Sequence, residues 1–256
     1  MENVQLSLVI IGAQKASTTA LAQYLNQHPD IYFPEVKETH FFRRPLTTDG
    51  PADRDPELLN RRFVDAPGDC LYADGTPIYL YWPHAISLLK EHNSQMKLIV
   101  SLRHPVMRAY SAWSMERRRE REPLSFSAAI REGRSRVRNA PFGVHNIYSY
   151  VERGFYAQQL SHVFEIFDPA QVFILRSDQV SAQDEQMQAL LAFLGVDPIV
   201  FDPIEENVNP SSLAAPAGLE DDFTYLQDLY REDLVSLSDM LDIDISDWFS
   251  VPEIHF

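Results

Sequence analysis

The sequence has one cysteine, no long hydrophobic run and few cations in its last third, and each shortage excludes a class of protein. Cys70 alone cannot form an internal disulfide or a cysteine-based metal site, so we expect a reducing, cytoplasmic setting. No apolar stretch approaches the ~20 residues that span a bilayer. The N-terminus lacks the basic segment of a secretory signal. We therefore expect no membrane association.

The shortage of cations is confined to one part of the chain. The net charge is −15, and residues 1–176 carry 21 Lys and Arg against 19 Asp and Glu. Residues 177–256 carry only Arg231 against 18 acids. So acidic a surface repels polyanions, which argues against nucleic acid as a partner and against a sulfated polysaccharide as a substrate.

What is present indicates one globular domain. The 256 residues are 45% hydrophobic, enough for a full core, and no interdomain linker or repeat interrupts them. We predict a single domain over 1–256, ending in an acidic helical segment at about 219–256, where leucines and aromatics recur at helical spacing from Leu219 to Leu241. The oligomeric state stays open, a homodimer included.

The most informative stretch is 6–25, LSLVIIGAQKASTTALAQYL. Its apolar start predicts a buried parallel strand that stops at Gly12, and helical spacing begins at Ser17. The hydroxyl side chains at 17–19 are suited to cap that helix. A strand, a tight turn and a helix N-terminus form an anion site, to which Lys15 adds a full charge. The alternative is a plain strand–helix turn with an exposed lysine, because the Walker spacing is absent.

Two further segments carry candidate chemistry. Glu38 and His40 alternate with apolar neighbours, so both face one side and form a plausible general base, unless they are solvated loop residues. Arg103 follows the predicted strand 97–102, at the sheet edge where ligands bind in open α/β folds. Pro105 suits the first turn of a helix, and Ser111 lies two turns into it, where Arg103 and Ser111 could reach one phosphate.

Taken together and in order, GAQKASTTAL, KETHFF and RHPVMRAYSAW resemble the sulfotransferases that use 3′-phosphoadenylyl sulfate (PAPS). The likeness covers about residues 5–210 and is strongest to the branch that includes heparan sulfate N- and 3-O-sulfotransferase domains and many bacterial relatives. It implies a P-loop-like three-layer α/β/α fold with a central parallel sheet. It also implies PAPS as donor, PAP as product and no metal.

The resemblance also implies roles for single residues. Lys15, Ala16, Ser17, Thr18 and Thr19 would hold the 5′-phosphosulfate, and Lys15 would stabilise charge on the leaving phosphate. The 3′-phosphate would be bound by Arg103 and Ser111. Glu38 would be the catalytic carboxylate, with His40 as the competing base. The segment 154–160 is similar to the family's helix start after the nucleotide site, and it adds Tyr156 to the nucleotide-binding residues.

The departures from the family bear on the acceptor. Ser17 replaces the usual Gly, Gly75 stands where glycosaminoglycan enzymes carry a Lys, and no late basic loop follows Arg176. Residues 207–211 resemble a segment of simpler bacterial members. We therefore expect a small, neutral or cationic acceptor with a hydroxyl or amine, such as a guanidinium-type natural product.

Two rival functions remain at this stage. An ATP-dependent small-molecule kinase would need a carboxylate for magnesium at the end of a second core strand, and Asp74 is the only candidate. A non-catalytic PAP-binding or scaffold protein would use the acidic C-terminal helix for docking. The eight arginines between Glu116 and Arg138 form either a substrate flap or a solvated helical face.

Overall fold

The computed structural model describes residues 3–43, 55–204, 218–241 and 243–252. The chain divides into two compact units. Unit 1 comprises Met1–Leu102 and Val163–Glu206, and unit 2 comprises Arg103–His162 and Asn207–Phe256. The predicted segment at 207–211 lies outside the described residues, as do 44–54. No helix among the described residues is both long and apolar enough to cross a membrane.

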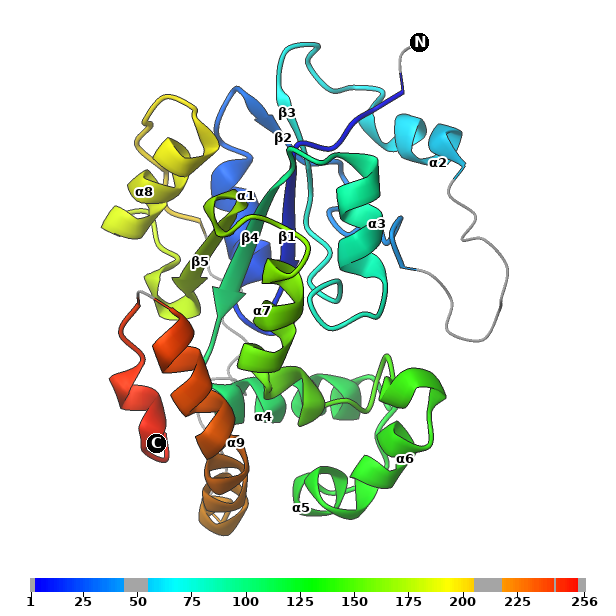
Figure 1. The fold of residues 1–256 in the computed structure, drawn as a ribbon, viewed down its shortest axis with the longest axis vertical. Helices are drawn as coiled ribbons and strands as arrows, with labels where there is room; N and C mark the ends of the chain where they lie inside the picture. Colours follow the sequence, from blue (N-terminus) through cyan, green and yellow to red (C-terminus); the bar gives the residue numbers. More distant parts are fainter. Residues whose placement is uncertain (1–2, 44–54, 205–217, 242, 253–256) are drawn as a thin grey trace. The chain divides into compact units, whose positions relative to one another are not determined.

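Unit 1 is built on a five-stranded parallel sheet (Figure 1). Its strand order is β2-β3-β1-β4-β5, so the first strand of the chain lies in the middle. The buried apolar runs predicted from the sequence are its central strands. The strands are β1 (Leu8–Gly12), β2 (Ile31–Tyr32), β3 (Leu71–Asp74), β4 (Lys97–Leu102) and β5 (Val172–Arg176).

Helices cover both faces of this sheet, as right-handed crossovers between parallel strands require. Figure 1 shows α1 (Thr18–Leu25) and α8 (Glu185–Leu194) on one side of the sheet and α3 (Ala85–His92) on the other. The three-layer α/β/α prediction is confirmed. The remaining elements of unit 1 are α2 (Pro56–Asn60), η1 (Arg61–Phe63), η5 (Pro169–Gln171) and η6 (Ser177–Gln179).

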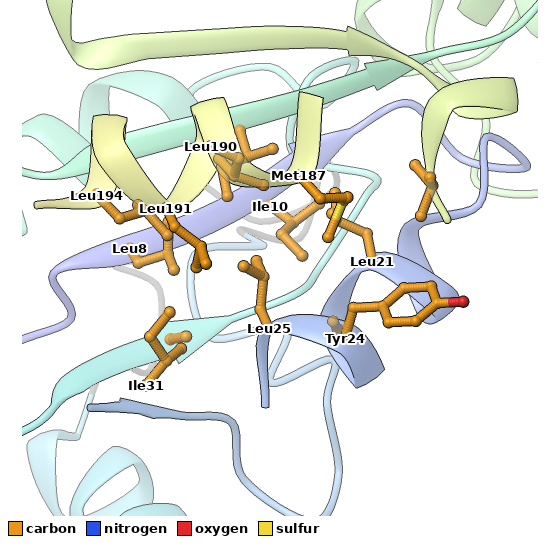
Figure 2. Close-up of a cluster of buried hydrophobic side chains, with 14 of the residues drawn as sticks. Leu8, Ile10, Leu21, Tyr24, Leu25, Ile31, Met187, Leu190, Leu191 and Leu194 are labelled. Carbon is orange, nitrogen blue, oxygen red and sulfur yellow. The ribbon is translucent and has the colours of Figure 1, made fainter. Parts of the chain in front are cut away.

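The core under α1 and α8 holds the anion-site turn at a fixed place on the sheet. Leu8 and Ile10 of β1 point to the same face and meet Leu21 and Leu25 of α1 (Figure 2). Four residues of α8 close this cluster from above: Met187, Leu190, Leu191 and Leu194. All of these side chains are almost fully buried, which fixes how α1 begins relative to the end of β1.

Unit 2 is helical in the residues that the structure describes. The acidic C-terminal helix is confirmed as α9 (Glu220–Met240), and Pro105 is the first residue of α4 (Pro105–Arg118), as expected. The helix predicted at 154–160 is α7 (Tyr156–Phe164), whose last two residues belong to unit 1. The other elements are α5 (Phe126–Ile130), η2 (Glu132–Arg134), α6 (Ser135–Arg138), η3 (Pro141–Gly143), η4 (Glu152–Gly154) and η8 (Ser246–Phe249).

Candidate functional site

The turn between β1 and α1 is fixed by backbone contacts. The Ala13 N–H donates to the Ser101 carbonyl of β4 at 2.7 Å, and the Ala16 N–H donates to the Ala13 carbonyl at 3.2 Å. Lys15 and Ser17 both have left-handed backbones, with φ of 76° and 53°. Such a backbone is uncommon for residues with a Cβ and is the conformation that glycine adopts most readily.

One sequence expectation at this turn is wrong in detail. Ser17 is the N-cap residue of α1, but its side chain makes no capping hydrogen bond. The left-handed backbone at this position replaces the extended conformation that a capping serine normally adopts. Ser17 and Thr19 are exposed, whereas Ala16 and Thr18 are buried, so the turn presents two hydroxyl-bearing residues to solvent.

This geometry suits an anion. The first N–H groups of an α-helix have no acceptor within the helix and lie at its positive end. Lys15, half-buried in the same turn, adds a full positive charge. The residues at 15–19 therefore fit a phosphate or phosphosulfate group.

The turn is anchored on the segment that follows β3. The Leu80 N–H donates to the Ile11 carbonyl at 2.8 Å. A Cβ at Gly12 would lie 2.6 Å from the Cβ of Leu80, so the two backbones approach closely enough to require glycine. Residues 74–80 thereby support the end of β1.

The same residues 74–80 hold the segment with Glu38 and His40. Gly75 donates its N–H to the Lys37 carbonyl at 3.0 Å, and His40 donates its N–H to the Thr76 hydroxyl at 3.3 Å. Two residues further on, the Phe42 N–H donates to the Tyr79 hydroxyl at 3.1 Å. The anion-site turn and the candidate base are thus built on one common support within unit 1.

Asp74 lies at the centre of that support. Its fully buried carboxylate accepts hydrogen bonds from the Thr39 N–H at 3.1 Å and the Thr39 hydroxyl at 2.8 Å. It accepts a third from the Thr76 hydroxyl at 2.7 Å. Burial raises the pKa of Asp74, and the hydrogen bonds from Thr76 and Thr39 oppose that effect. A carboxylate so enclosed is not presented to a magnesium ion, which removes the observation that favoured the kinase.

The side chains of Glu38 and His40 come together, as the period-two spacing predicts. The His40 Nε2 lies 3.4 Å from one carboxylate oxygen of Glu38, and the Lys37 Nζ lies 3.5 Å from the other. Glu38 and His40 are 39% and 44% exposed, so an acceptor can approach both of them. Partial burial lowers the pKa of His40, although the charge of Glu38 opposes this. The φ of 53° at His40 is a further strained backbone of the kind found at functional sites.

Sequence reasoning missed two members of this group. The sequence indicates Lys37 only as the first residue of the motif KETHFF, and it indicates Asp74 only as a candidate magnesium ligand. The signal for Lys37 was its place beside Glu38, but its burial depends on Gly75, 38 positions later. The support given by Asp74 depends on the hydroxyls of Thr39 and Thr76, whose contacts no local pattern shows.

In unit 2 the predicted nucleotide-binding residues lie around the start of α4. Arg103 follows β4 directly, and its carbonyl accepts a hydrogen bond from the Tyr156 hydroxyl at 2.8 Å. Burial lowers the pKa of Arg103 and raises that of Tyr156 to about 12. Ser111 lies on α4 and is 4% exposed. The first turn of α7 is capped by Asp233, whose carboxylate accepts from the Ala157 N–H at 3.1 Å.

The described part of the chain contains no group of three or more His, Cys, Asp or Glu side chains that could hold a metal ion. The candidate chemistry in unit 1 therefore consists of an anion-binding turn, an exposed carboxylate, an imidazole and a buried ammonium. A parallel α/β sheet with these groups at the ends of its strands is typical of a protein that binds a phosphorylated ligand.

Comparisons with known proteins agree with this class. No protein-family profile matches the chain. It is similar to human heparan sulfate glucosamine 3-O-sulfotransferase 3B1, with 26% identity over 196 residues (76% of this chain, 47% of that protein). To human heparan sulfate glucosamine 3-O-sulfotransferase 6, the identity is 30% over 197 residues (76% and 53%). The chain thus spans about half the length of the curated relatives it matches.

Solved structures extend the likeness over nearly the whole chain. A sulfotransferase from Alicyclobacillus acidocaldarius matches with a TM-score of 0.80 and 28% identity, covering 96% of this chain and 99% of that one. The sulfotransferase domain from the curacin biosynthetic pathway, at a TM-score of 0.55 and 14% identity, shares the fold (93% and 98% covered). In sequence and in fold the chain is therefore similar to sulfotransferases.

Proposed function

We propose that this protein transfers the sulfuryl group of PAPS to a hydroxyl or amine of a small, neutral or cationic acceptor and releases PAP. The observation that carries the proposal is the common support of residues 74–80, which holds an anion-binding turn and an exposed carboxylate in one unit. The likeness to sulfotransferases in sequence and fold supports the choice of a sulfuryl donor over other phosphorylated ligands.

Each candidate residue has a part in this proposal. The N–H groups and hydroxyls of 16–19, with Lys15, bind the 5′-phosphosulfate, and Lys15 stabilises the charge that the leaving phosphate acquires. Arg103 and Ser111 bind the 3′-phosphate, with Tyr156 holding the Arg103 backbone through its 2.8 Å hydrogen bond.

The transfer itself requires one proton acceptor. The bond between sulfur and the phosphate oxygen breaks, its electron pair leaves with PAP, and a new bond forms between sulfur and the acceptor's oxygen or nitrogen. The acceptor's proton goes to the exposed carboxylate of Glu38, with His40 beside it as the alternative base. Positioning and charge stabilisation supply most of the rate in such group transfers.

The proposal for the acceptor rests on charge. The last 80 residues carry 18 acids and one cation, so this part of the chain attracts cations and repels sulfated polymers. Amino- or guanidino-bearing natural products and simple alcohols fit this preference.

One assay tests donor and acceptor together. The protein is incubated with PAPS, or with ATP and magnesium, in the presence and absence of EDTA. Choline, 2-aminoethanol, arginine and a heparan sulfate oligosaccharide serve as acceptors. We expect PAP release that needs PAPS and an acceptor and is insensitive to EDTA. ATP consumption without PAP release would contradict the donor, preference for the oligosaccharide would contradict the acceptor, and PAP binding without turnover would contradict catalysis.

A further inference from the structure

Lys37 places a buried positive charge directly behind the carboxylate of Glu38. Its side chain runs over Gly75, where an added Cβ would lie 2.9 Å from the Lys37 Cγ and 3.4 Å from its Nζ. The Nζ has no hydrogen-bond partner among the described residues. Its contact with the Glu38 Oε1 at 3.5 Å is an ion pair without hydrogen-bond geometry.

The other charged groups that the structure describes around Lys37 do not supply a hydrogen-bond acceptor for its Nζ. Asp74 attracts the ammonium, but its carboxylate already accepts three hydrogen bonds from Thr39 and Thr76. His40 and Arg43 lie in the same charged group and contribute no acceptor charge. Burial lowers the pKa of Lys37, and the charges of Glu38 and Asp74 favour its protonated form. Glu38 is therefore the carboxylate with which this ammonium forms its ion pair.

Lys97, in the same unit, shows how a purely structural lysine is accommodated. Its Nζ donates to the carbonyls of Phe193 and Leu194 at 2.8 and 2.7 Å, at the C-terminus of α8. A lysine at a helix C-terminus stabilises the unpaired carbonyls there. Lys37 has no such role, and a buried ammonium without hydrogen bonds destabilises the fold that contains it.

We propose that Lys37 is a positioning residue that acts through Glu38: its buried ammonium holds the carboxylate from behind by the ion pair at 3.5 Å, while the exposed side of that carboxylate receives the acceptor's proton. The inference rests on the proposed function, because it assigns Glu38 as the base. A base must lie within hydrogen-bond reach of the proton that it accepts, so the position of the carboxylate decides how well it acts. The burial of the Nζ keeps it from contact with substrate, so its effect reaches the reaction only through Glu38.

The test replaces the charge and retains the packing. Lys37→Met keeps an unbranched chain over Gly75 and removes the ammonium. With PAPS and the acceptor that gives the highest turnover in the panel above, we expect kcat/KM at neutral pH to fall about tenfold. The loss should fall on kcat rather than on the KM for the acceptor, because a misplaced base slows the chemical step. The Kd for PAP should stay within about twofold of wild type, because a loss confined to Glu38 leaves ground-state nucleotide binding intact.

Two matched variants separate charge from structure. Lys97→Met removes a second partly buried lysine of unit 1 and should lower thermal stability without lowering kcat. Lys37→Ala combined with Gly75→Lys returns an ammonium to the same space from the opposite segment, which the alanine leaves open. We expect this double variant to recover most of the lost kcat. A purely structural Lys37 would give no such recovery.

The outcomes distinguish this inference from the proposed function. If wild type turns over PAPS and Lys37→Met keeps the wild-type kcat, the inference on Lys37 is wrong and the function stands. If wild type neither binds PAP nor turns over PAPS, the proposed function is wrong. The carboxyl resonance of 13C-labelled Glu38, assigned with Glu38→Gln, then decides: a chemical shift at neutral pH that is the same in Lys37→Met as in wild type overturns the inference.

Discussion

Unit 1 and unit 2 each contain a cluster of cations and glutamates, but the clusters differ in how completely the charges are paired. In unit 1, the Lys37 ammonium and the His40 imidazole approach Glu38 at 3.5 and 3.4 Å, and neither contact is a tight hydrogen bond. In unit 2, Arg136 donates to both oxygens of Glu122 at 3.0 and 2.8 Å. The first cluster leaves its carboxylate accessible, whereas the second encloses it.

The enclosed cluster has the features of a structural ion pair. Glu122 also accepts from the Leu124 N–H at 2.8 Å, and the Arg136 guanidinium lies 3.7 Å from the centre of the Tyr148 ring. Burial alone would raise the pKa of Glu122, but the hydrogen bonds from Arg136 and Leu124 outweigh it and lower the pKa. Both carboxylate oxygens of Glu122 and three guanidinium nitrogens of Arg136 are hydrogen-bonded, so little remains for chemistry. Incomplete pairing is therefore the feature that distinguishes a candidate reactive carboxylate from a structural one.

The largest expected effect is that of Glu38→Gln. The amide keeps the size of the side chain but cannot accept a proton as a base. We expect turnover to fall by about two to four orders of magnitude, with PAP affinity and thermal stability unchanged. Steady-state kinetics measures turnover, calorimetric titration measures PAP affinity, and thermal unfolding measures stability. Weakened PAP binding would move Glu38 into the nucleotide site and would break the contrast with Glu122.

Arg136→Met should give the opposite result, a large loss of stability with little loss of turnover. It leaves the buried Glu122 without its bidentate partner, which costs about 2–3 kcal/mol for hydrogen bonds to a charged group. Urea unfolding measures the loss. Arg138→Met, at an exposed arginine of the same helix α6, is the control and should change stability by less than about 0.5 kcal/mol. A specific loss of kcat in Arg136→Met, with stability retained, would revive the substrate-flap interpretation of this segment.

Asp74→Asn should lower both turnover and stability, each by less than the corresponding variant above. The asparagine amide cannot accept from the Thr39 N–H and both hydroxyls as the carboxylate does. We expect a loss of about 1–2 kcal/mol in unfolding free energy and a drop in kcat, because the segment that carries Glu38 loses its anchor. Thr39→Val, which removes one of the three hydrogen bonds, should fall between Asp74→Asn and wild type. Magnesium-dependent ATP turnover that disappears in Asp74→Asn would instead support the kinase.

The sequence was sufficient for the parts of the molecule that local patterns encode. The strand at 97–102, the helix that begins at Pro105 and the long helix α9 agree with prediction, because apolar runs, an N-terminal proline and helical spacing act over a few residues. The joint position of Glu38 and His40 follows from their alternation.

The remainder depends on contacts between distant segments. Nothing in the arginine-rich stretch shows that Arg131 pairs with Asp222, or that this stretch divides into three short helical pieces. Local patterns likewise do not show that Asp233 of the acidic helix caps α7 or that Asp222 is buried. Predictions from residue type failed where partners come from elsewhere in the chain, since pairing decides whether a charge is structural or available.

The smallest effect, and the finest test of the contrast between loose and enclosed charges, is expected for Gly75→Ala. The added methyl would lie 2.9 Å from the Lys37 Cγ, closer than real contacts, so the lysine side chain must shift while Glu38 keeps its own anchors. We expect turnover to fall by about fivefold or less, equivalent to less than about 1 kcal/mol, with stability nearly unchanged because a flexible side chain yields. Gly68→Ala is the matched control, since nothing lies within 4 Å of its added methyl. Equal turnover in both variants would mean that the position of the Lys37 ammonium over Gly75 does not influence the exposed carboxylate.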